Sequence, residues 1–215
     1  MKKRVLNLPQ VLAITGQSGA GKGTAVKRIL MLCKEAGISV CYMSTGQLIL
    51  DCIATGTHMG QKMDSLNSQG KLNPYFVMTS LLFNEIVKKY QKGQFLLLDG
   101  IPRTEEAVKI LHHWMELGFI ESLQVIEIVA NDPLCEVRLI ERTKRDKRKE
   151  LSVDGNPGVP DLIKIRNKIS WWTANKDEIR RLLILHGIYN SISNEGSIAE
   201  FEDQLEELLT EKAAP

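Results

Sequence analysis

Short apolar runs alternate with longer amphipathic segments along this chain, and this alternation constrains its fold most strongly. The runs VLAIT at 11–15 and FLLLD at 95–99 are almost entirely apolar, which is typical of strands that helices cover on both faces. The alternation predicts an α/β fold built from βαβ units around a parallel sheet. Further strands are expected at 39–43, 124–130 and 188–193, and helices at 22–35, 75–91, 104–117, 132–148, 161–186 and 197–211.

Two long segments interrupt the alternation. The first, 45–74, contains short helical pieces separated by glycines, and the second, 149–160, is loop-like and follows the basic stretch RTKRDKR. Long interruptions in a compact α/β chain are often binding flaps or lids. We therefore expect one domain over residues 1–215, with insertions that contact ligands.

The composition fits a single globular domain, since 43% of the 215 residues are hydrophobic and 25% are charged. A net charge of +2 gives no electrostatic reason to expect a nucleic-acid partner. No run approaches the roughly 18 apolar residues that a membrane-spanning helix needs, and no signal-peptide pattern follows MKKR. We expect a cytoplasmic protein that binds neither nucleic acid nor membrane.

The cysteines give no support for a zinc site, because no two of them have the C-x-x-C spacing. We expect buried, reduced thiols instead. The four residues are Cys33, Cys41, Cys52 and Cys135.

A glycine-rich stretch, GQSGAGKGT at 16–24, lies between the first predicted strand and the first predicted helix. Glycines let successive backbone N–H groups point at phosphate oxygens, and the helix N-terminus adds positive charge. Lys22 can reach the terminal phosphates, and a hydroxyl can serve Mg²⁺. Gly23 takes the usual hydroxyl position, and Thr24 follows one place late. The rival dinucleotide motif G-x-G-x-x-G fails because Thr24 stands at its last glycine.

A second motif, DGIPRT at 99–104, begins at the last residue of the predicted strand 95–99. An acidic residue at the end of a buried strand beside a phosphate loop can hold Mg²⁺ through water, so Asp99 is a candidate. Taken alone, Asp99 could equally be a cap or turn residue, and Arg103 could be a solvated surface arginine.

The two motifs together, GxxGxGKGT and DGxPRT, resemble the adenylate kinase family of nucleoside monophosphate kinases. That family carries a glycine between the lysine and the threonine of its phosphate loop, as Gly23 does here. The similarity covers most of the chain in the right order. It continues at YMSTGQLI (42–49), GQKMDSLNSQGKLNP (60–74), VRLIERTKR (137–145) and SNEGSIAEF (193–201).

The resemblance implies a P-loop NTPase-type three-layer fold with a five-stranded parallel sheet, an NMP-binding flap over 45–74 and a short lid over 143–161. It implies a monomer that transfers the γ-phosphoryl group of Mg·ATP to a nucleoside monophosphate, with AMP the default acceptor. The implied ligands are ATP, a nucleoside monophosphate and Mg²⁺, without zinc. Such transfer rests on positioning and charge neutralisation, which arginines and Mg²⁺ supply.

Roles for individual residues follow by position from the same resemblance. The ATP phosphates are expected against Gly19, Ala20, Gly21, Lys22, Gly23 and Thr24, with Arg138 stacked on the base and Arg142 on phosphates. The monophosphate is expected against Thr45, Gly46, Lys71, Leu72, Asn73, Gly100 and Arg103. Thr24 and Asp99 are expected to hold Mg²⁺, the contact being water-mediated. The catalytic set is Lys22, Arg103, Arg142, Arg166 and Lys168.

The chain departs from the family pattern on the acceptor side. Gln47 replaces the aspartate of S-T-G-D, and Leu50 replaces an arginine that clamps the acceptor phosphate. Ala107 stands where the family has a glutamine that reads adenine, unless a one-residue deletion puts Glu106 there.

The lid departs as well. The pattern R-x-D-D-x-E-x-x-x-x-R is degraded to NPGVPDLIKIR at 156–166, which lacks the first arginine and leaves Arg166 and Lys168 as the later pair. Only the arginine side chain offers a planar group that can form two parallel hydrogen bonds to a phosphate. An arginine that contacts the transferring phosphoryl group raises the catalytic rate by about 10³-fold or more. The losses predict a slow enzyme, an altered acceptor or a loss of catalysis.

Three hypotheses remain open at this point. The first is an adenylate-kinase-like phosphotransferase, the second a catalytically weak or inactive nucleotide-binding regulatory protein of the same fold, and the third a kinase for a different small acceptor. Lys144, Arg145 and Arg148 either replace the missing lid arginines or form a solvated, basic helix end.

Two aromatic stretches complete the candidates. Trp171 and Trp172 are expected to pack in the core or the lid, with stacking on a base as the alternative. The stretch His112–Trp114 predicts a solvated helix edge with one buried aromatic side chain.

Overall fold

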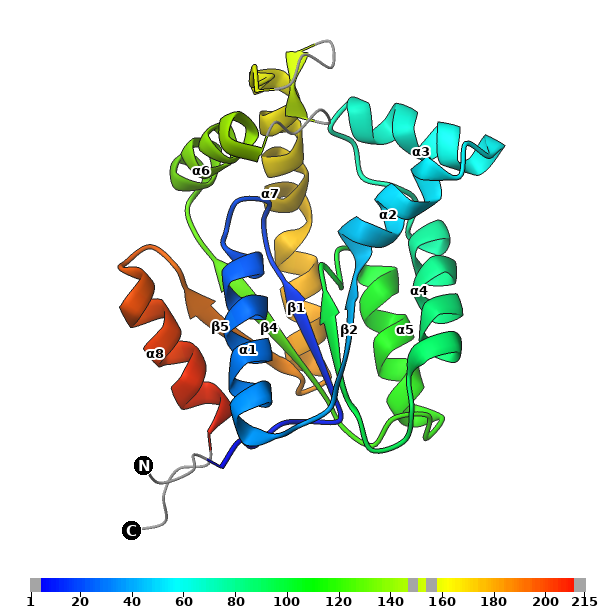
Figure 1. The fold of residues 1–215 in the computed structure, drawn as a ribbon, viewed down its shortest axis with the longest axis vertical. Coiled ribbons are helices and arrows are strands. Elements are labelled where there is room, and N and C mark those ends of the chain that lie inside the picture. Colours follow the sequence, from blue (N-terminus) through cyan, green and yellow to red (C-terminus); the bar gives the residue numbers. More distant parts are fainter. Residues whose placement is uncertain (1–4, 147–150, 154–157, 211–215) are drawn as a thin grey trace.

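Five parallel strands form one sheet in the order β2-β3-β1-β4-β5 (Figure 1). The computed structural model describes residues 5–146, 151–153 and 158–210. Because all the strands run in the same direction, their carboxyl ends meet at one edge of the sheet. The strands are β1 (Val11–Thr15), β2 (Val40–Ser44), β3 (Phe95–Asp99), β4 (Leu123–Val129) and β5 (Tyr189–Ser193).

Helices cover both faces of this sheet. α1 and α8 pack on one face, while α4, α5 and the second half of α7 cover the other (Figure 1). The predicted three-layer α/β fold with a five-stranded parallel sheet is therefore confirmed. The helices are α1 (Lys22–Ala36), α2 (Thr45–Ala54), α3 (His58–Ser68), α4 (Tyr75–Lys89), α5 (Glu105–Glu116), α6 (Asp132–Asp146), α7 (Leu162–Leu185) and α8 (Ile198–Leu209).

The position of β1 at the centre of the sheet explains why its sequence is almost entirely apolar. All five of its residues are buried, because β3 and β4 flank it and helices cover it above and below. Leu12 and Ile14 face the core beneath α1 and α8, whereas Val11 and Ala13 face the core beneath α5 and α7. A strand that alternates between two apolar cores must be apolar throughout.

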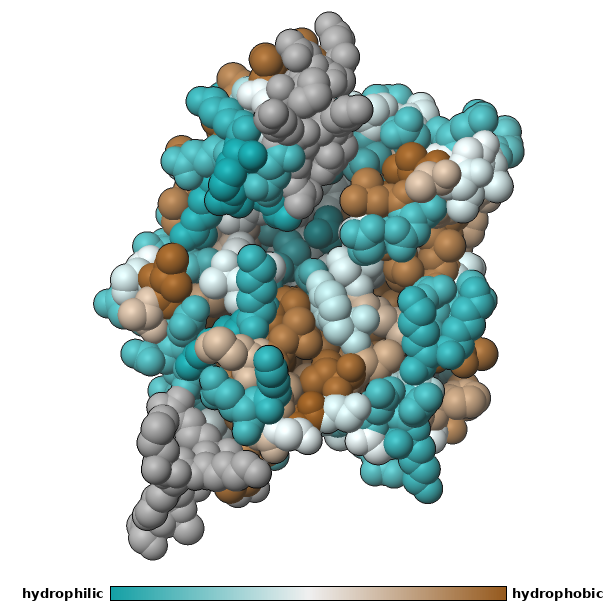
Figure 2. All heavy atoms as spheres, viewed as in Figure 1, coloured by the Kyte–Doolittle hydropathy of each residue, from teal (hydrophilic) through white to brown (hydrophobic). Residues whose placement is uncertain are grey.

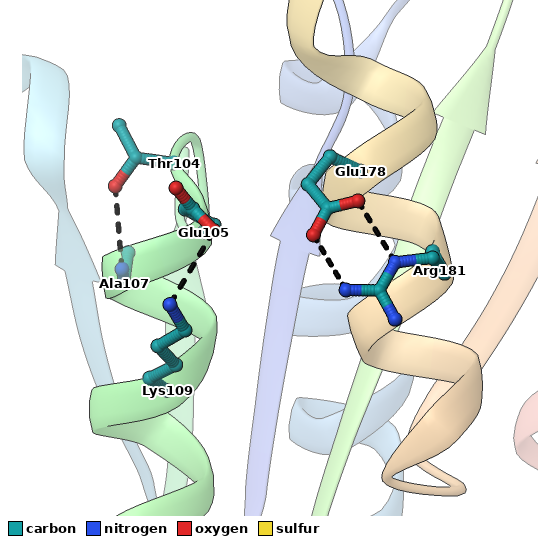
Figure 3. Close-up of polar contacts among 6 residues, drawn as sticks. All are labelled: Thr104, Glu105, Ala107, Lys109, Glu178 and Arg181. Carbon is teal, nitrogen blue, oxygen red and sulfur yellow. Dashed lines mark hydrogen bonds and ion pairs between the residues drawn. The ribbon is translucent and has the colours of Figure 1, made fainter.

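Most element boundaries lie within two residues of those predicted, and capping residues account for several of them. Thr104 ends the loop before α5, and its hydroxyl accepts a hydrogen bond from the Ala107 N–H at 3.2 Å (Figure 3). Asp161 caps α7 by accepting hydrogen bonds from the N–H groups of Ile163 and Lys164. The ends predicted at 148 and at 211 lie outside the described residues.

The insertion at 45–74 folds into two helices, α2 and α3, and a return segment that leads into α4. Of the predicted lid at 143–161, the described parts are 143–146, 151–153 and 158–161. Val153 donates to the Val159 carbonyl at 2.9 Å, and Asp161 donates to the Leu151 carbonyl at 2.8 Å. The described parts of this segment are therefore joined by backbone hydrogen bonds just before α7 begins.

All four cysteines are free thiols, with Cys52 half-buried and the others buried. Burial raises the pKa of Cys33 and of Cys135 to about 11, so these thiols stay protonated at neutral pH. Along the described chain, helices lack the combination of length and apolar character that crossing a membrane requires.

Candidate nucleotide site

The sheet brings the two sequence motifs together. The strands β1 and β3 are neighbours, with Ile14 paired to Asp99, so the phosphate-loop motif and the DGIPRT turn leave the sheet side by side. The Gly100 N–H donates to the Ile14 carbonyl at 2.9 Å, and the Thr15 hydroxyl donates to the Pro102 carbonyl. Figure 2 shows that the surface is hollowed above these strand ends, between α6 and α2, and that hydrophilic residues floor the hollow.

The phosphate loop depends on glycines for its conformation. Gly16, Gly19 and Gly21 have φ angles of 126°, 88° and 107°, a region that other residues rarely adopt. A Cβ on Gly19 would lie 2.6 Å from the Cys135 carbonyl oxygen, and one on Gly21 would collide with the Asn194 side chain. The loop is thus held against β4, α6 and the segment after β5 in a shape that only glycine allows.

Gly23 differs from these three glycines. It lies in the first turn of α1, its φ is not positive, and an added Cβ would meet nothing within 4 Å. The packing and the backbone of the protein therefore do not require glycine at this position.

Lys22 folds back over the loop. Its Nζ donates to the carbonyls of Gly16 and Gln17, both at 2.8 Å. The pKa of Lys22 is lowered to about 7: burial is the largest cause, the charge of Arg103 adds to the lowering, and Asp99 opposes both effects. Arg142 also contributes to this lowering, so the structure places these predicted site residues in one electrostatic environment.

Arg103 and Thr45 are positioned by the same turn. The Arg103 Nε donates to the Gly100 carbonyl at 3.1 Å, and burial lowers the pKa of the guanidinium while Asp99 opposes the effect. The Thr45 hydroxyl donates to the carbonyls of Asp99 and Gly100, at 3.0 and 3.2 Å. Gly100 has a φ of 88°, which lets the turn pass close to the start of α2.

The oxygen groups beside the loop fit a hard divalent cation. Asp99 ends β3 next to the loop, and its carboxylate accepts a hydrogen bond from the Tyr42 hydroxyl at 3.2 Å. Thr24 lies in the first turn of α1. A carboxylate and a hydroxyl are ligands that Mg²⁺ accepts, directly or through water. Within the described residues, no group of three or more His, Cys, Asp or Glu side chains is arranged to hold a metal by itself.

Arg138 joins three segments on the other side of the loop. Its guanidinium donates to the Asn194 carbonyl at 3.0 Å and to the Ala20 carbonyl at 3.5 Å. The Asn194 amide donates to the same Ala20 carbonyl at 2.7 Å. Asn194 is buried and was not singled out from the sequence, although it lies in the stretch SNEGSIAEF that resembles the family.

The remaining predicted cations have other partners. Arg142 lies 3.5 Å from the Asp146 carboxylate, and Arg166 makes a bidentate pair with Glu136 at 2.9 to 3.2 Å. Lys168 donates to the Asn67 side chain of α3 at 3.3 Å. Arg145 pairs with Asp146 at the exposed end of α6, and Arg148 lies outside the described residues. The catalytic roles of Arg166 and Lys168 stay predictions.

A second cavity lies beside the DGIPRT turn. Its volume is about 380 Å³, and its walls are the flap return at 72–75, the start of α5 at 104–106 and four side chains of α7. Trp171 lines this cavity, whereas Trp172 is buried in the core. Leu72 and Asn73 are residues that the sequence predicts at the acceptor, whereas no local sequence pattern indicates the wall contributed by α7.

Fold and site together define a protein of the P-loop type with a two-helix insertion after β2. The family model for adenylate kinase matches residues 14–208, and the chain belongs to this family. It is a phosphotransferase by class.

Several curated relatives match nearly the whole chain. An adenylate kinase of Prochlorococcus marinus is 28% identical over 214 residues, covering 98% of this chain and all of the relative. One of Parasynechococcus marenigrum is 29% identical over 210 residues, with the same coverage of both chains. One of Nautilia profundicola is 24% identical over 208 residues, covering 96% of this chain and 99% of the relative. The chain is thus a divergent member of the family over most of its residues.

Proposed function

We propose that this protein transfers the γ-phosphoryl group of Mg·ATP to a nucleoside monophosphate, with AMP as the default acceptor. The observation that carries the proposal is the meeting of Lys22, Arg103 and Asp99 where β1 and β3 end beside the glycine loop. Family membership and full-length relatives named adenylate kinase support the same conclusion.

The donor half of the proposed site uses the phosphate loop. The N–H groups of residues 19–24 and the N-terminus of α1 bind the ATP phosphates. Lys22 exchanges its carbonyl partners for phosphate oxygens, which restores a full charge on its amine. When bound, Mg²⁺ neutralises charge on the phosphates, and Thr24 and Asp99 are the residues that hold it. Arg138 supports the base and Arg142 the phosphates.

The acceptor half uses the flap, residues 45–74. Arg103 binds the acceptor phosphate, since a hydrogen bond to the Gly100 carbonyl holds its partly buried guanidinium at this turn. Thr45 and Gly46 at the start of α2, and residues 71–73 of the flap return, surround the rest of the acceptor. Closing of this flap and of the short lid, 143–161, excludes water and thereby suppresses ATP hydrolysis.

A specific observation favours a second candidate, a nucleotide-binding protein with little catalysis. Arg166 is paired with Glu136, Lys168 with Asn67, and Leu50 stands in place of an expected arginine. In the kinase proposal, Arg166 and Lys168 must leave these partners to neutralise the transferring group, which slows the reaction. In the second candidate they stay where they are.

A coupled assay separates the two candidates. Mg·ATP is offered with AMP, CMP, UMP, GMP or a deoxy form, and ADP production is followed. Formation of ADP that depends on a monophosphate supports the kinase. Tight binding of ATP with no turnover on any acceptor supports the regulatory protein and contradicts the kinase.

The matched controls lie on one helix. Lys22→Ala is expected to abolish turnover, because the transferred group loses the cation that Lys22 supplies. Lys27→Ala removes an exposed lysine further along α1 and is expected to retain it. Equal turnover in the two variants would show that the loop assignment is wrong.

A further inference from the structure

A buried asparagine that follows the last strand contacts the phosphate loop, residues 16–24. Asn194 comes directly after β5 and is 6% exposed. Its backbone N–H donates to the carbonyl of Val129, the last residue of β4, at 2.8 Å. Its side-chain amide donates to the Ala20 carbonyl at 2.7 Å. The sheet therefore fixes the backbone of Asn194, and its side chain reaches a peptide in the middle of the loop.

Arg138 of α6 contacts the same peptide from a second element. Its Nη2 donates to the Asn194 carbonyl at 3.0 Å, and its Nη1 donates to the Ala20 carbonyl at 3.5 Å. Two side chains thus converge on one carbonyl, and Arg138 also holds the residue that supplies the other donor. A carbonyl that accepts hydrogen bonds from an amide and from a charged guanidinium has a strongly preferred direction.

The direction of this carbonyl sets the direction of the next N–H group. The peptide between Ala20 and Gly21 is trans, so its C=O and N–H groups point in opposite directions within one plane. Because Asn194 and Arg138 hold the carbonyl, the Gly21 N–H points away from both of them. This N–H has no hydrogen-bond acceptor among the described residues. It is a backbone donor that is open to a phosphate oxygen.

Gly21 needs such contacts because its own backbone does not select one conformation. Its φ and ψ are 107° and 15°, and glycine adopts positive and negative φ about equally well. Its carbonyl accepts hydrogen bonds from the N–H groups of Thr24 and Ala25 at 2.9 and 3.2 Å, so α1 fixes the peptide that follows Gly21. Asn194 and Arg138 fix the peptide that precedes it.

We infer that Asn194, together with Arg138, is a positioning residue that turns the Gly21 N–H toward the phosphates of the donor nucleotide. This inference rests on the proposed function, because it concerns the donor of that reaction. Asn194 acts through the Ala20 carbonyl. Without its amide the peptide can rotate and present that carbonyl oxygen to the phosphates, which replaces an attraction by a repulsion. A donor that is already oriented needs no reorganisation when the ligand binds.

Inorganic tripolyphosphate tests the inference, because it carries phosphates without a base or a sugar. Asn194→Leu replaces the amide by a side chain of similar size that cannot donate a hydrogen bond. Calorimetric titration is expected to show tripolyphosphate and ATP both bound about tenfold more weakly than by the unsubstituted protein. Unchanged affinity for tripolyphosphate, or no binding of it by the unsubstituted protein, would overturn the inference.

A positioning role and a merely structural role predict different results. A structural role would lower the urea midpoint of unfolding and leave the affinity of the folded protein for tripolyphosphate unchanged. A positioning role lowers that affinity in protein that is still folded at the temperature of the titration. In turnover assays it also raises the KM for ATP and leaves the KM for the monophosphate unchanged. Asn194→Ala removes the same donor and is used should the leucine variant not fold.

A double variant tests whether Arg138 and Asn194 act on one carbonyl. Arg138→Met is expected to weaken tripolyphosphate several-fold, although this ligand has no base for an arginine to contact. In Asn194→Leu/Arg138→Met the loss is expected to be smaller than the product of the two single losses, because both residues orient the same peptide. A loss equal to the product would show that Arg138 contributes only its charge, and would contradict the shared role.

A control substitution on β5 separates the loop contact from a general effect of leucine. Asn190 is half-buried, and its side chain makes no hydrogen bond to a described residue. Asn190→Leu is expected to retain the affinity for both ligands. If tripolyphosphate is weakened in Asn194→Leu and no protein shows turnover, the kinase proposal fails and the inference holds. Turnover with unchanged affinity in Asn194→Leu would do the reverse.

Discussion

The guanidinium of Arg103 helps to keep the pKa of Lys22 at about 7, although the two residues belong to loops that follow different strands. Burial is the larger cause, and Asp99 opposes both. A lysine in this state is close to half-protonated at neutral pH. It is thus prepared to take up a proton when anionic phosphates arrive.

Binding of Mg·ATP is therefore expected to be linked to proton uptake. Phosphates raise the pKa of Lys22, so affinity is greatest below pH 7 and falls as pH rises above the pKa of the free protein, by up to about tenfold per pH unit. Calorimetry in buffers of different ionisation enthalpy measures the uptake. Lys22→Arg keeps a charge that does not titrate and is expected to lose the linkage. If the unsubstituted protein and Lys22→Arg took up the same number of protons, the uptake would belong to a group other than Lys22.

Gly19 and Gly23 are expected to respond in opposite ways to alanine. Gly19→Ala places a methyl group against the Cys135 carbonyl at a positive φ and is expected to destabilise the fold by about 2 kcal/mol or more. Gly23→Ala adds a methyl group in open space and is expected to stabilise the free protein by about 0.5 kcal/mol. Urea unfolding gives both values. A loss of ATP affinity in the stable Gly23→Ala variant would show that the open space receives the nucleotide.

Restoring an arginine at Leu50 is expected to improve the proposed reaction. Leu50 is 43% exposed on α2, so the change costs little stability. A guanidinium there gives the acceptor phosphate a second charged partner and is expected to lower the KM for the monophosphate about tenfold. Leu117→Arg, at an exposed leucine after α5, is the matched control. Equal kinetics in the two variants would show that the flap does not carry the phosphate site.

Protonation of His186 is expected to destabilise the protein in mild acid. Its ring stacks on that of His112 with centroids 3.6 Å apart, and burial and His112 lower the pKa of His186 while Glu116 opposes them. The folded state thus binds this proton less well than the unfolded state. The stability is fully present above the unfolded pKa of about 6.5 and declines as pH falls through the lowered folded value. The urea midpoint of unfolding is expected to vary less between pH 5 and 8 in His186→Phe than in the unsubstituted protein. If the two proteins showed the same dependence on pH, the stacked histidines would not be the cause of the acid sensitivity.

The stretch His112–Trp114 shows how far such local patterns reach. Trp114 is buried and His113 exposed, as the sequence predicts. The stacking of His112 on His186 joins α5 to the end of α7, and no local pattern indicates it. The same holds for Trp171 and Trp172, since adjacent residues of one type take different places.

The sequence alone determined the features that depend on neighbouring residues. An all-apolar β1 requires cover on both faces, Gly19 and Gly21 permit the phosphate loop, and Thr104 caps the helix that follows. These are consequences of side-chain polarity and backbone conformation over a few residues, so they can be read without the fold. The combination of two such motifs sufficed to indicate the family.

The tertiary structure decided what depends on packing between distant segments. Asn73, Glu106 and Trp171 line one cavity only because the flap return and the start of α5 pack beside α7. Arg166 pairs with Glu136 because α6 and α7 are adjacent. The sequence shows that Arg166 is present, but not that another side chain already binds it. The lowered pKa of Lys22 likewise arises from burial and from charges that the sheet brings together. Electric fields and desolvation are properties of the assembled fold, and a linear pattern cannot specify them.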